Sequence, residues 1–222
     1  MYLKDIEAIR LDDNQLFELK KLVAEGEGLQ LEFKRKASYP EKIVRELVAF
    51  ANTEGGTLLV GVDDDKTIPG VKYPEEESYS IQQALQSCKP KLIFHESILA
   101  ISDNRFVVRY DVPQSEKRPH FIKQENTLEC FVREADKSIK ASREMQEIVK
   151  RSKKKKDVRF LYGEYERQLM QYLHTSRTIT LTDFCSLTKL NRFKASRKLI
   201  LLVLANVLKI TATEKGDVYS RY

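Results

Sequence analysis

Alternating apolar and polar positions predict a strand over residues 29–34, where Leu29, Leu31 and Phe33 alternate with polar side chains. Residues 106–112 show a similar period and predict a second, longer strand. Further strands are expected at residues 57–62, within 91–101, and at 128–133, 208–213 and 218–222. These segments are short and separated by turn residues, which is typical of strands that form a sheet.

Apolar residues at helical spacing predict an amphipathic helix over residues 40–51, in which Ile43, Leu47 and Ala51 share one face. Other helices are expected at residues 13–23, 78–88, 142–149, 165–175, 182–190 and 192–206. The polar segment 114–126 is expected to be a loop. Because strands and helices are mixed along the chain, we expect an α+β fold, a mixed sheet covered by helices.

The order of the elements predicts two domains. Residues 1–149 hold the mixed sheet, and residues 150–157 contain the run KRSKKKK, whose like charges favour a linker or a polyanion-binding arm. Residues 158–222 contain three expected helices followed by a strand pair, which is the element order of a small winged helix-turn-helix domain. We therefore expect a boundary at the basic run.

Positive charge is concentrated near the C-terminus. The whole chain has 39 basic and 33 acidic residues, a net charge of +6. Residues 150–222 hold 17 basic and 6 acidic residues, or +11, so residues 1–149 hold 22 and 27, or −5. A segregated excess of this kind indicates a polyanionic partner.

The remaining composition narrows the class of protein. No apolar run approaches the roughly 20 residues that cross a bilayer, and the first residues lack the apolar core of a secretory signal. The three cysteines form no CxxC pair, which argues against a zinc site. We expect a soluble cytoplasmic protein with no membrane partner.

Several motifs occur in one order along the chain. They are LEFKRK at residues 31–36, AFANTEGGTLLVGVDDD at 49–65, VPQS at 112–115, RPH at 118–120 and CFVR at 130–133. In this order they resemble the Schlafen-type AlbA-like domain, which is often found in bacterial transcriptional regulators. The resemblance covers about residues 13–150. Local turn chemistry also accounts for Asn52, Gly55 and Gly56 as a helix-to-strand connection.

The resemblance also implies a nuclease alternative. Some Schlafen members are metal-dependent ribonucleases with three acids, two of them five residues apart, the second in an E-F-K motif. Glu27 and Glu32 match that spacing, and Asp63 or a neighbouring aspartate is the candidate for the third acid. Together they are candidate catalytic residues and ligands for Mg²⁺ or Mn²⁺. The competing interpretation is an exposed loop and a solvated acidic turn.

Two groups of basic residues are candidate nucleic-acid contacts. In the first domain they are Lys34, Arg35 and Lys36, where Lys34 either contacts phosphate or pairs with Glu32. In the second domain Lys194, Arg197 and Lys198 share a helix face, opposite an apolar side that includes Phe193 and Ile200. The other candidates there are Asn191 and Arg192 at the start of that helix, and Lys215 and Arg221 in the hairpin.

These observations favour a DNA-binding transcriptional regulator that recognises duplex DNA as a homo-oligomer, such as a dimer, without a cofactor. The nuclease described above, acting on RNA, is one alternative. A protein-interaction adaptor, with the winged helix used for dimerisation or partner binding, is another. An ATPase is disfavoured because no GxxxxGK[ST] phosphate-binding loop is present.

Overall fold

The structure, a computed structural model, describes residues 11–125, 127–153 and 160–222. It divides into two compact units, Met1–Ser138 and Ile139–Tyr222. Each unit has a hydrophobic core of its own. Across the described ranges, no helix combines the length and the apolar content that crossing a membrane requires.

The N-terminal unit is built on a four-stranded mixed sheet. Its strands are β1 (Leu31–Lys34), β2 (Gly55–Val60), β4 (His95–Ser102) and β5 (Arg105–Pro113), in the order β1-β2-β5-β4. β1 runs parallel to β2, and the other pairs are antiparallel. The expected α+β class with a mixed sheet is confirmed.

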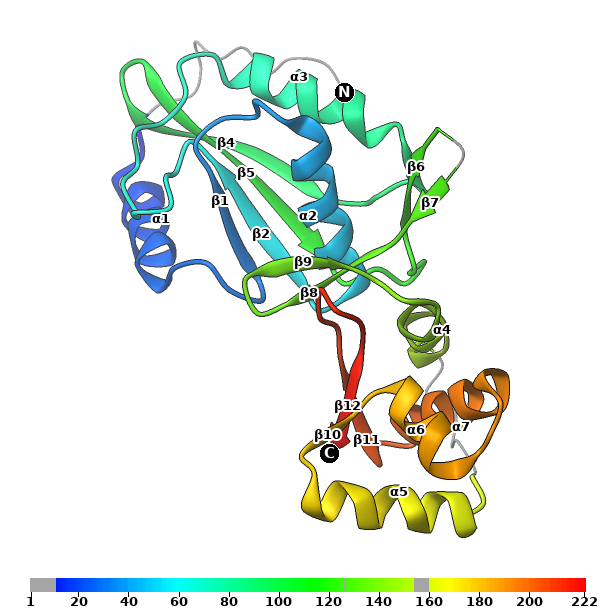
Figure 1. Ribbon diagram of the computed structural model, residues 1–222. Helices are drawn as coiled ribbons and strands as arrows, with labels where there is room; N and C mark the ends of the chain where they lie inside the picture. Colours follow the sequence, from blue (N-terminus) through cyan, green and yellow to red (C-terminus); the bar gives the residue numbers. More distant parts are fainter. Residues whose placement is uncertain (1–10, 126, 154–159) are drawn as a thin grey trace. The chain divides into compact units, whose positions relative to one another are not determined.

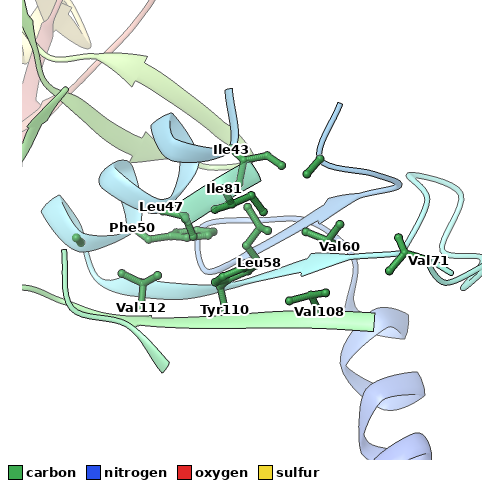
Figure 2. Packing of buried hydrophobic residues seen from close by; sticks show 12 residues of the cluster. Ile43, Leu47, Phe50, Leu58, Val60, Val71, Ile81, Val108, Tyr110 and Val112 are labelled. Atoms are coloured by element: carbon green, nitrogen blue, oxygen red, sulfur yellow. The ribbon is translucent and has the colours of Figure 1, made fainter. Parts of the chain in front are cut away.

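Helices pack against both faces of this sheet (Figure 1). α2 (Pro40–Asn52) and α3 (Pro74–Leu85) lie on one face, and α1 (Asp13–Glu25) lies on the other. Figure 2 shows the apolar stripe of α2, including Ile43 and Leu47, directed at residues of β2 and β5. α3 begins four residues before its expected start, because Pro74 fits the first turn of a helix.

Shorter strands surround this core. β3 (Cys88–Lys89), β6 (Phe121–Gln124) and β7 (Thr127–Glu129) form one small sheet, and β8 (Phe131–Glu134) pairs with β9 (Lys137–Lys140). The segment expected to be a loop at residues 114–126 therefore contains β6. β6 is only four residues long and its sequence, FIKQ, does not alternate apolar and polar residues, so the pattern does not identify a strand.

Asn52 ties the end of α2 to two of these segments. Its amide Nδ2 donates to the carbonyl oxygens of His120 (3.0 Å) and Phe131 (2.9 Å), and its Oδ1 accepts from the backbone N–H of His120 (2.7 Å). Only 3% of Asn52 is exposed. The structural interpretation of this residue is thus supported, since all three backbone groups are satisfied inside the protein.

The C-terminal unit contains four helices and three strands within its described residues: α4 (Arg143–Ser152), α5 (Glu164–Thr175), β10 (Thr178–Ile179), α6 (Leu181–Thr188), α7 (Arg192–Leu204), β11 (Leu208–Thr211) and β12 (Val218–Arg221). The strands form an antiparallel sheet in the order β10-β12-β11. Leu169, Phe184, Leu199 and Tyr219 are central to the core.

α4 differs from the expectation in two ways. It continues to Ser152, so Lys150 and Arg151 are helical rather than part of a linker. It also groups with the C-terminal unit, whereas the sequence pattern assigned it to the first domain. An amphipathic helix pattern shows that a helix buries one face, but not which core receives that face. The remainder of the proposed linker, from residue 154, lies outside the described residues.

The hydrogen bonds of Asn52 predict a large cost for its removal. We expect Asn52→Ala to lower the free energy of unfolding by about 2–3 kcal/mol, because it leaves buried backbone groups without partners. Urea denaturation measures this loss. Asn104→Ala, in the exposed turn between β4 and β5, is the matched control and should change little. Equal unfolding midpoints for the two variants would contradict the assigned role.

Candidate functional site

Glu27 covers the outer edge of strand β1. Its Oε1 accepts from the backbone N–H of Phe33 at 2.9 Å. On the same strand, the carbonyl oxygen of Leu31 accepts from the Gly28 N–H (3.0 Å) and from Arg133 Nη2 (3.3 Å). These contacts occupy backbone groups that an edge strand otherwise presents to other chains.

Desolvation raises the pKa of Glu27 above its usual value of 4.5. The Phe33 N–H and the Lys34 charge act in the opposite direction, whereas the carboxylates of Glu32 and Asp64 also raise the pKa. Ionising the Glu27 carboxyl group at neutral pH therefore costs more free energy in the folded protein than in water, although the carboxylate accepts the Phe33 N–H.

Arg133 occupies the centre of a buried ionic cluster, and none of its side chain is exposed. Its Nη2 is 2.5 Å from Glu32 Oε2, and its Nη1 is 2.6 Å from Glu46 Oε2. Its Nε and Nη2 also donate to the Gly28 carbonyl oxygen, at 3.1 and 2.9 Å. The guanidinium is thus neutralised and hydrogen-bonded, the two conditions under which a buried charge is tolerated.

The cluster reaches two further residues. Ser138 donates to Glu46, and Lys34 pairs with the second oxygen of Glu32. Desolvation, followed by the nearby Glu32 charge, raises the pKa of Glu46. Lys34 also donates to the Phe33 carbonyl oxygen at 2.8 Å, so its ammonium group is held within the protein. Of the two interpretations of Lys34, the structure contains the ion pair.

The three acids predicted for a metal site each have a different partner. Glu27 is bound to the β1 backbone, Glu32 lies between Lys34 and Arg133, and Asp63 lies 3.3 Å from Arg35. No group of three or more His, Cys, Asp or Glu residues that could hold a metal ion occurs within the described ranges. Both oxygens of Glu32 already have cationic partners, so this donor set does not fit a divalent cation.

A cleft of about 1000 Å³ opens next to Glu27, between the end of α1 and residues of the sheet. Its lining includes Glu25, Glu27, Thr57, His95 and Asp111. Both oxygens of Asp111 are bound by Arg109, and Oδ1 also accepts from Thr57 at 2.7 Å. Arg109 neutralises Asp111, which leaves Glu25 and Glu27 as the acidic residues of a lining that contains no lysine or arginine.

The basic residues of α7 have different surroundings from one another. Arg192, Lys194 and Arg197 are exposed. Lys198 instead lies 2.6 Å from the buried Glu166 of α5. Burial raises the pKa of Glu166, but the bond to Lys198 and the Gly163 N–H outweigh it, so the pKa lies below 4.5. Lys198 is thereby tied to the core of the unit.

Phe193 and Asn191 of α7 were also assigned roles from the sequence. Phe193 was expected on the buried side but is 75% exposed, because the core of the unit takes the stripe of Ala195, Leu199 and Leu202. Asn191 is the N-cap of the helix, and its Oδ1 accepts from the Lys194 N–H at 2.9 Å. That oxygen therefore already has a partner.

The remaining candidates are exposed and belong to elements other than α7. Arg35 and Lys36 follow β1 in the N-terminal unit, whereas Lys215 lies in the turn after β11 and Arg221 at the end of β12. Sequence reasoning did not identify Glu46 or Arg133 as members of a cluster. Arg133 is the last residue of the CFVR motif, which gives no sign of its partners, and no local pattern distinguishes Glu46.

Comparison with protein families identifies a match in the N-terminal half. A family model described as "Schlafen, AlbA_2" matches residues 27–142, which is more than half of the 222 residues. No curated protein matches the chain.

Two solved structures are similar in part. One is the N-terminal domain of a protein from Nitrosomonas europaea described as related to the ATP-dependent DNA helicase RecG, with 20% identity and a TM-score of 0.41 over 52% of this chain and 86% of that one. The other is the DIP2311 protein from Corynebacterium diphtheriae, with 15% identity and a TM-score of 0.44. That match covers 94% of this chain and 39% of the other.

The role of Glu27 at the strand edge predicts different outcomes for two substitutions. Glu27→Gln retains an oxygen that accepts the Phe33 N–H, so its stability at neutral pH should equal or exceed that of the wild type. Glu27→Ala should lose about 1 kcal/mol, the net value of one hydrogen bond. Urea denaturation at pH 7 distinguishes them, and equal losses in both variants would contradict the role.

The pH dependence of the free energy of unfolding, compared between the wild type and Glu27→Gln, provides a second readout. Because the pKa of Glu27 is raised on folding, the folded protein holds its proton more tightly than the unfolded chain. The contribution of Glu27 to stability is therefore greatest below its unfolded pKa, near 4.5, and declines as pH rises through the folded pKa. Glu27→Gln should lack this decline.

Proposed function

Because the chain belongs to the Schlafen AlbA_2 family, whose model covers more than half of it, we propose that its N-terminal unit is the family domain and that its C-terminal unit is a winged helix that binds nucleic acid. The order α5, β10, α6, α7, β11, β12, with a β10-β12-β11 sheet, supports a winged helix. In this arrangement α7 occupies the position of the recognition helix.

One observation carries the proposal. Arg192, Lys194 and Arg197 of α7 are exposed, and none of these three forms a salt bridge with a carboxylate in the described ranges. An unpaired cation on an exposed helix attracts phosphate without first having to break a contact within the protein. The net charge of +11 over residues 150–222 has the same sign.

The ligand we propose is duplex DNA, because a helix with exposed arginines fits the major groove, where arginine pairs with guanine. A dimer acting as a transcriptional regulator follows from this role, since two recognition helices read two half-sites. The ribonuclease alternative has less support, because Glu32 is already neutralised by Lys34 and Arg133.

Binding of duplex DNA by the full chain tests the proposal. Fluorescence anisotropy at several salt concentrations should give an affinity that falls steeply with salt, with a slope of about 0.9 per phosphate contacted. The double variant Lys194→Ala/Arg197→Ala should bind at least about tenfold more weakly, because each lost contact to a base or phosphate reduces the affinity.

The control is Arg167→Ala on α5, which removes an exposed arginine that is already paired with Glu164. It should bind as the wild type does. The proposal fails if the wild-type chain shows no binding at low salt, or if the α7 variant and the control bind equally well. Competition by unlabelled RNA of the same length separates the two kinds of nucleic acid.

A further inference from the structure

Polar contacts hold helix α4 beside α7 and β12. Ser196 of α7 donates to Glu144 Oε1 at 2.7 Å, and Ser142, the N-cap of α4, donates to Asp217 beside β12. Met145, Ile148 and Val149 form the buried face of α4. α4 therefore has a defined position beside α7 within the C-terminal unit.

The opposite face of α4 is basic. Arg143 and Lys150 are both exposed, and they are seven residues apart, or about two helical turns, so they share a face. The half-buried Glu147 lies between them, and the half-buried Arg151 follows. Among these four residues cations outnumber the single carboxylate by three to one, so this face attracts anions.

The position of Ser196 shows where α4 lies around α7. Successive residues of an α-helix differ by about 100° in direction. Ala195 is buried in the core, Ser196 contacts α4, and Arg197 is exposed. α4 thus flanks α7 between its buried stripe and the face that carries Arg197.

We propose that α4 is a phosphate-contacting helix of the nucleic-acid interface, with Arg143 and Lys150 binding the backbone of a duplex whose groove receives α7. This inference rests on the proposed function. A duplex lying along the Arg197 face passes beside α4, and phosphate contacts on such a flank fix the orientation of a protein without reading sequence. The interface then includes α4, which precedes the winged helix in the chain and which the sequence pattern assigned to the first domain.

The double variant Arg143→Ala/Lys150→Ala tests this role in the full-length chain. Each lost phosphate contact lowers the slope of log affinity against log salt by about 0.9, so the slope should fall by about 1.8. The weakening should be of the same size for duplexes of unrelated sequence. Thermal unfolding should be unchanged, since both side chains are exposed.

The matched control is Lys20→Ala/Lys21→Ala, which removes two exposed cations from α1 of the N-terminal unit. Its slope should stay near that of the wild type. An unchanged slope in the α4 variant, or an equal fall in variant and control, would overturn the inference. If the wild type binds DNA and Arg197→Ala weakens binding, but the α4 variant does not weaken it, only this inference fails. If the wild type does not bind DNA, the proposed function itself fails.

Discussion

The buried guanidinium of Arg133 holds several elements of the N-terminal unit together. Arg133, with no exposed side-chain surface, requires negative partners, and Glu32 and Glu46 supply them from β1 and α2. Removing one partner of a buried ion pair typically costs about 3–5 kcal/mol, because the other charge is left uncompensated. The cluster therefore fixes β8, β1, α2 and the turn at Gly28 relative to one another.

The need to neutralise Arg133 and to satisfy the edge of β1 limits the other roles that Glu32 and Glu27 can have. Glu32 neutralises Arg133 and Lys34, and Glu27 satisfies the edge of β1, so both acids of the nuclease-like spacing have structural partners. The cleft beside them is lined by further carboxylates. In the C-terminal unit the balance is reversed, because Arg192, Lys194 and Arg197 are exposed without ion-pair partners in the described ranges. The basic unit is thus the better surface for a polyanion.

The sequence was sufficient to predict elements whose apolar pattern is regular. The stripe of α2 and the alternation of β5 place both elements within a few residues of their observed ends, and the order of motifs identifies the family. The Arg133–Glu46 contact could not be predicted, because it joins residues 87 positions apart and neither position has a distinctive pattern.

Other errors have a similar origin. Lys198 shares a helix face with Lys194 in the sequence pattern, but its partner Glu166 comes from another helix. Phe193 was assigned to a buried apolar side opposite the basic residues, whereas the packing of α7 uses the stripe of Ala195 and Leu199. α4 was assigned to the wrong side of the boundary because its amphipathic pattern does not identify its core. In each case tertiary contacts decide between assignments that the local pattern permits.

Hydrogen–deuterium exchange of the full chain, with and without duplex DNA at low salt, tests most directly whether the C-terminal unit carries the interface. Slower exchange is expected in peptides that cover residues 143–153 and 191–198, with no change around residues 25–36. Protection confined to residues 25–36 and 63–66, around the carboxylates, would contradict it.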